Sequence, residues 1–111
     1  MAAEDKKRAA HQALVDRVLN GEGRASREQR AQAFSDAGVP APLRALISKV
    51  ATRPAQVTDA DFAAAKAAGF SEDQVFELVI AAAVGQSARL YDAGLAALAA
   101  ATGPGRPDNA P

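Results

Sequence analysis

A repeated signal for helix starts constrains the fold of this 111-residue chain more than any other feature. Three times, a Ser or Thr is followed three residues later by Gln or Asp. This is the spacing of a capping box, in which each side chain accepts the backbone N–H of the other residue at a helix N-terminus. No segment alternates polar and apolar residues as a strand does. The sequence therefore predicts an all-α fold. The three pairs are Ser26 with Gln29, Thr58 with Asp61, and Ser71 with Gln74.

Caps, glycine stops and apolar periodicity together place about five helices in a single-domain bundle over residues 1–102. The last helix begins after Ser71 and reaches about Ala101, either as one long helix or as two helices joined near Gly85. The Gly- and Pro-rich tail over 103–111 is predicted to be disordered. The expected segments are 3–20, 26–38, 40–54, 58–69 and 71–101.

The apolar residues of this chain are small. They make up 49% of the sequence, aromatic residues only 5%, and alanine is the commonest among them. Alanine favours helices, but each alanine buries little area, and burial contributes only about 25 cal/mol per Å² of apolar surface. A bundle of this size and composition is marginally stable by itself. We therefore expect a homo-oligomer, in which a second copy covers part of the apolar surface.

Charge and cysteine content exclude several classes of function. Thirteen basic and thirteen acidic residues cancel, so the chain lacks the positive field that nucleic-acid binding requires, and we expect no nucleic-acid partner. The absence of cysteine excludes disulfides, thiolate metal sites and thiol catalysis, and it fits a cytoplasmic protein. We expect no metal and no other cofactor.

A membrane location is not expected. The N-terminal residues carry charges without the apolar segment of a secretory signal. The longest unbroken apolar run covers residues 78–85, far short of the roughly 20 residues that span a bilayer.

The segment AKAAGFSEDQVFELVIAAAV, residues 65–84, places a helix stop directly before a capped long helix. In this order of elements the chain resembles the carboxymuconolactone decarboxylase-like superfamily, which includes the alkylhydroperoxidase D-like proteins. The resemblance is best over residues 43–98. It implies an all-α domain that associates into dimers, trimers or hexamers.

The chain departs from that family where the chemistry would lie. Active members carry two cysteines three residues apart and a histidine four residues later. Counting back from Gly69 puts Asp61 at the histidine place and Val57 and Pro54 at the cysteine places, and an upstream glutamate would fall near Pro42. The resemblance is thus to a divergent member without cysteines, and thiol peroxidase activity is not expected.

Four polar residues are candidates for a pocket that works without thiols: Asp61, Glu77, Arg89 and Tyr91. They could serve as acid, base or carboxylate clamp if they converge. Each also has a simpler interpretation. Asp61 fits a charged helix start, and Tyr91 could pack with its hydroxyl at the surface.

Arg89 could form an ion pair with Asp92 on one helix face. Glu77 could be solvated, or it could pair with Lys49 or Arg53. His11, the only histidine, is expected to be a partly exposed helix residue.

Small residues in the last helix favour close helix packing. Ala81 with Gly85, and Ala83 with Ser87, lie four residues apart, and Leu90 follows. Such pairs let two helices cross closely, either within one chain or between subunits. Our leading hypothesis is a non-catalytic protein that forms oligomers or binds a protein partner. The alternatives are an enzyme that uses the acidic and Arg side chains, such as a decarboxylase or isomerase, and a small-ligand-binding protein.

Overall fold

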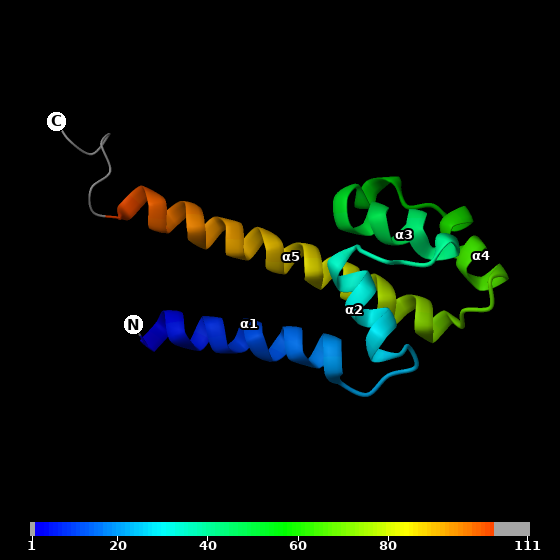
Figure 1. Ribbon diagram of the computed structural model, residues 1–111, viewed down its shortest axis with the longest axis horizontal. Helices are drawn as coiled ribbons and strands as arrows, with labels where there is room; N and C mark the ends of the chain where they lie inside the picture. The colour runs from blue at the N-terminus through cyan, green and yellow to red at the C-terminus, as the bar shows by residue number, and fades with distance from the viewer. Residues whose placement is uncertain (1, 104–111) are drawn as a thin grey trace.

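A computed structural model describes residues 2–103 of the chain, and these residues form an all-α fold (Figure 1). Five α-helices and one short 3₁₀ helix are joined by brief loops, and no strand occurs in the described range. The elements are α1 (Ala2–Asn20), α2 (Arg27–Ser35), α3 (Ala41–Thr52), η1 (Pro54–Gln56), α4 (Asp59–Ala67) and α5 (Glu72–Thr102).

The predicted capping boxes form. At α5, the Ser71 hydroxyl accepts the Gln74 N–H at 3.1 Å, and the Gln74 side chain accepts the Ser71 N–H at 2.8 Å. Ser26 caps α2 in the same way. These contacts satisfy backbone donors that have no partner inside the helix, so the helix starts follow directly from the sequence.

The prediction that α2 reaches Gly38 is wrong, because the helix ends at Ser35. Asp36 adopts the left-handed conformation, with φ 50°, and its N–H bonds back to the carbonyls of Gln32 and Ala33. Asp is one of the few residues besides glycine that accept this geometry readily, so the stop comes two residues before the glycine.

The last helix is continuous through Gly85, which resolves the two alternatives left open by the sequence. Gly103 follows its C-terminus, and the rest of the predicted tail lies outside the described residues. In the loop expected over 52–57, a 3₁₀ turn follows α3.

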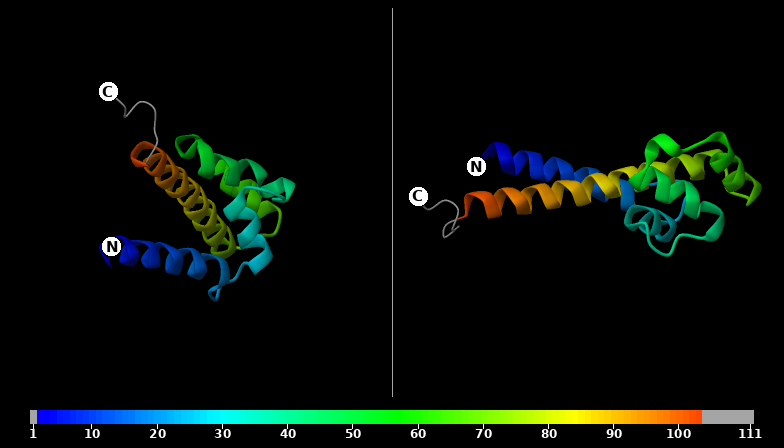
Figure 2. Two further views of the ribbon diagram at one scale, coloured as in Figure 1. Left: turned by 60° about the vertical axis from the view of Figure 1, so that its left-hand side comes forward. Right: turned by 90° about the horizontal axis from the view of Figure 1, so that it is seen from above.

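The core lies where α2, α3 and α4 pack against the N-terminal half of α5, at the right of Figure 1. Its largest fully buried side chains are Leu43, Leu46, Ile47 and Leu78. The helix α1 instead runs alongside the C-terminal half of α5, in the opposite direction (Figures 1 and 2).

This arrangement is elongated, with extents of 61 × 28 × 21 Å. Its radius of gyration is 17.5 Å, whereas a compact domain of this length has one of about 13 Å. No described helix is long and apolar enough to cross a bilayer.

Candidate functional site

The four polar candidates lie in four separate environments, each with a structural partner. Asp61, at the start of α4, accepts a hydrogen bond from the Thr58 N–H at 2.9 Å. It also forms an ion pair with Lys49 of α3 at 3.0 Å. The hydrogen bond from the Thr58 backbone, and then the one from the Lys49 side chain, hold the pKa of the Asp61 carboxyl below its ordinary value. Asp61 therefore ties α4 to α3 as a stable carboxylate.

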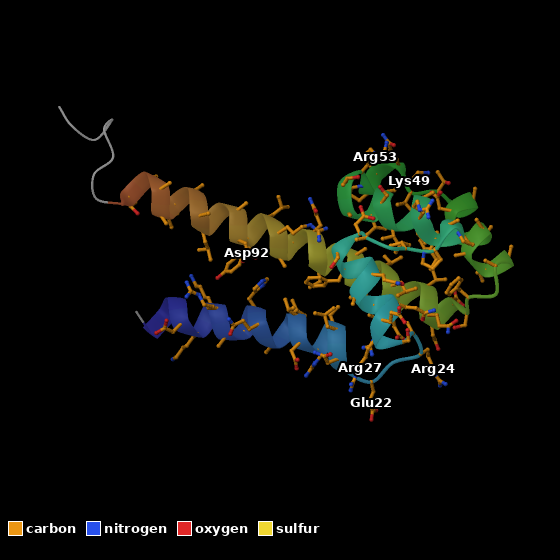
Figure 3. The ribbon with its side chains drawn as sticks, viewed as in Figure 1. Glu22, Arg24, Arg27, Lys49, Arg53 and Asp92 are labelled. Carbon is orange, nitrogen blue, oxygen red and sulfur yellow. The ribbon has the colours of Figure 1, made fainter. Side chains whose placement is uncertain are left out.

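Glu77 of α5 holds the loop between α1 and α2. Its two carboxylate oxygens accept the backbone N–H groups of Arg24 at 2.8 Å and Ala25 at 3.0 Å. Neither Lys49, which binds Asp61, nor Arg53, which points outward from the end of α3 in Figure 3, is its partner. The proposed pairing of Glu77 with these bases is therefore wrong, and the carboxylate organises a loop.

Arg89 joins α5 to the end of α2. Its guanidinium donates to the Phe34 carbonyl at 2.7 Å and to the Gln86 side-chain oxygen at 3.0 Å. Asp92, the partner suggested by the sequence, lines the groove between α1 and α5 (Figure 3). Arg89 thus satisfies carbonyl oxygens of its own chain.

Tyr91 contacts His11 of α1, so the only tyrosine and the only histidine of the chain meet. Their ring centroids are 4.4 Å apart, with a tilt of 37°. The two rings line a groove of about 580 Å³ between α1 and α5, whose lining also includes aliphatic residues and the charged residues Arg8, Asp16 and Asp92. Both rings are half-buried, as expected for His11.

These four residues do not converge. Asp61 faces α3, Glu77 the α1–α2 loop, Arg89 the end of α2, and Tyr91 the helix α1. An acid–base site needs its groups within hydrogen-bond reach of one reacting molecule. The described residues also contain no group of three His, Cys, Asp or Glu side chains that could hold a metal ion.

Sequence reasoning missed Arg30 of α2, which is only 6% exposed. Its guanidinium donates to the Gly21 carbonyl at 2.6 Å and to the Val18 carbonyl at 3.3 Å, at the C-terminus of α1. A cation there satisfies carbonyls that lack helical partners and complements the helix dipole. Arg30 lies three residues before Ala33, so both residues share the buried face of α2. This spacing is the signal from which the buried position of Arg30 could have been predicted.

The face of α5 opposite its buried residues carries an exposed apolar stripe. Phe76 is 65% exposed, Leu90 64% and Leu98 58%. The intervals between its members alternate between four and three residues from Phe76 to Gly94, which is the spacing of a coiled-coil seam. We call this face the outer stripe. It consists of Phe76, Ile80, Ala83, Ser87, Leu90, Gly94, Leu98 and Ala101, all of them exposed.

The predicted interface residues divide between two faces of α5. Ala83, Ser87 and Leu90 lie on the outer stripe. Ala81 is fully buried within the chain, and Gly85 is buried where the backbone of α2 crosses at Phe34. Ala81 and Gly85 therefore pack within the chain and are not available to an interface between subunits.

Comparisons with protein-family models, with curated proteins and with solved structures find no match to this chain. The geometry of the described residues is therefore the basis for a functional argument.

Proposed function

We propose that this chain is a non-catalytic protein that self-associates through the outer stripe of α5. One observation carries the proposal: the longest helix exposes four large apolar side chains on one face, and the positions of that face from Phe76 to Gly94 follow coiled-coil spacing. Contiguous exposed apolar surface of this kind marks interaction sites. Heptad spacing further specifies that the surface fits another helix.

The composition supports the same proposal. The described core contains few large side chains, and four others lie on the outer stripe, namely Phe76, Ile80, Leu90 and Leu98. Full burial of such a side chain contributes about 1.5–3 kcal/mol relative to exposure. Association would therefore add stability that a single chain lacks.

The non-catalytic part of the proposal rests on how the polar residues are used. The carboxylates of Asp61 and Glu77 and the guanidinium of Arg89 each bind another part of the same chain. A group committed to holding a loop or a helix end is not available to a substrate. We further propose, from the resemblance over residues 43–98, that the chain is a divergent relative of the carboxymuconolactone decarboxylase-like proteins.

The substitution Ala83→Glu tests the surface. Ala83 lies in the middle of the outer stripe, so a carboxylate there would be desolvated in the complex and should weaken association at least tenfold, about 1.4 kcal/mol. The matched control is Ala96→Glu. Ala96 is exposed on the same helix but points about 140° away.

Sedimentation equilibrium of both variants gives the result. The proposal expects the Ala83→Glu protein to dissociate at concentrations where the wild type and Ala96→Glu remain associated. If all three proteins associate equally, the outer stripe is not the interface.

A second candidate function, small-ligand binding, is favoured by the groove between α1 and α5. Its volume of about 580 Å³ falls within the range of about 300–1,000 Å³ for ligand sites, and Tyr91 and His11 offer a ring face and hydrogen bonds. Binding of the fluorescent dye 1-anilinonaphthalene-8-sulfonate tests it. The dye signal should fall with Tyr91→Ala but not with Ala96→Glu, and equal signals would argue against a site in this groove.

A further inference from the structure

We propose that two copies of the chain pair their α5 helices in antiparallel orientation, about a twofold axis that passes beside Ser87. This inference rests on the proposed self-association and specifies its partner and register. Ser87 is the midpoint between the outermost large side chains of the outer stripe: Phe76 and Leu98 lie eleven residues on either side of it, and Ile80 and Gly94 lie seven.

The order of side-chain sizes along the outer stripe favours an antiparallel pair. An antiparallel pair centred on Ser87 places Ile80 opposite the partner's Gly94, and Leu90 beside the partner's Ala83. Nothing lies within 4 Å of the place where a Gly94 side chain would begin, so a partner's large side chain has room there. A parallel pair would instead set Gly94 against Gly94 and Ser87 against Ser87, which leaves gaps between the backbones.

The charges at the two ends of the outer stripe also favour the antiparallel orientation. The first turn of α5 carries Glu72 and Asp73. At the other end of the stripe, Lys7 and Arg8 of α1 line a small cavity beside Leu98. The antiparallel register brings Phe76 next to the partner's Leu98, so these acids approach these bases at both ends. Lys66 of α4 lines the same hollow as Phe76 and Glu72, which leaves one base against two acids at this end. A parallel pair would place like charges together.

The outer stripe is accessible to a second helix. On α5, the residues that pack against α2 and α3 lie on the side opposite the outer stripe. The large members of the stripe are all exposed, although Leu98 lines a small cavity with α1 at Lys7 and Arg8. A second helix can therefore lie along the stripe without displacing an element of the fold.

Disulfide cross-linking tests the register, because the wild-type chain has no cysteine. Three single-cysteine variants are needed: Ser87→Cys, Ile80→Cys and Gly94→Cys. In the proposed pair, the two copies of position 87 face each other, and position 80 faces position 94 of the partner. The two copies of position 94 lie about 21 Å apart, beyond the Cα separation of about 4.4–6.8 Å that a disulfide allows.

Under mild oxidation, Ser87→Cys should cross-link by itself. A mixture of Ile80→Cys with Gly94→Cys should give about tenfold more cross-linked dimer than either variant alone, because only the mixed pair meets the distance limit. Sedimentation of each reduced variant shows whether it still associates.

The alternative outcomes separate the two proposals. Cross-linking of Gly94→Cys by itself would show a parallel pair and overturn the register, while self-association would stand. A dimer that cross-links at none of these positions would place the interface elsewhere and overturn the inference. A monomeric wild type would overturn both the inference and the proposed function.

Discussion

At the scale of single residues, two charged side chains hold the loop between α1 and α2. Arg30 binds the Gly21 carbonyl, and Glu77 binds the N–H groups of Arg24 and Ala25. Both contacts join different elements of the fold, and this is why the sequence could not predict them. A helix pattern shows which face a residue occupies, but not which loop crosses that face.

The substitution Glu77→Gln should lower the free energy of unfolding by about 1–3 kcal/mol, because an amide NH₂ group would face a backbone donor that the carboxylate now satisfies. The control is Glu22→Gln in the same loop, where the side chain is exposed and points outward (Figure 3). Urea denaturation of both variants measures the difference. Equal stability of the two would show that the Glu77 contacts contribute nothing.

Acid should weaken the contribution of Asp61. Its pKa is lowered in the folded state, so the contribution is fully present above the unfolded-state pKa of about 3.9 and is lost as pH falls through the lower, folded-state value. The difference in unfolding free energy between wild type and Asp61→Asn should therefore be constant above about pH 5 and shrink in more acidic solution.

The control for this pH dependence is Asp59→Asn, in the same turn of α4. It leaves the Lys49–Asp61 ion pair intact, so its acid-induced loss of stability should run parallel to that of the wild type. A difference between wild type and Asp61→Asn that stays the same down to pH 3 would contradict the account.

At the scale of elements, α5 is one helix with two faces made of similar residues. The sequence predicted its start at Ser71 from the capping box, and the structure confirms it. It could not separate Ala81 from Ala83, because alanine is equally compatible with a buried and an exposed position. That division depends on where α2 crosses α5, which only the tertiary structure determines.

The close crossing at Gly85 gives a prediction at this scale. A side-chain carbon on Gly85 would lie 2.7 Å from the carbonyl carbon of Phe34 in α2, closer than any packed contact, and backbone cannot move aside as a side chain can. Gly85→Ala should therefore destabilise the protein by about 1–3 kcal/mol, because α2 and α5 must separate.

The matched control is Gly94→Ala in the same helix, where a side-chain carbon meets nothing within 4 Å. Alanine favours helix over glycine by about 1 kcal/mol. At concentrations at which both proteins are monomeric, this variant should therefore be as stable as the wild type or more so in thermal unfolding. A Gly85→Ala protein as stable as Gly94→Ala would show that the two helices do not cross as described.

At the scale of the whole molecule, the bundle has a packed end around α2, α3 and α4 and an extended end formed by α1 and α5 alone (Figure 2). The sequence predicted the all-α class and the number of helices, since caps and periodicity are local signals. It did not predict the elongated shape, which follows from α1 packing along the far half of α5. That shape leaves the outer stripe open along the length of α5.

If this open stripe is an interface, the wild-type chain associates, and sedimentation equilibrium measures that association. We expect a dimer of about 23 kDa, twice the chain mass of 11.4 kDa, in the micromolar range at which interfaces of ordinary size associate. A single species of 11.4 kDa throughout that range would contradict this expectation.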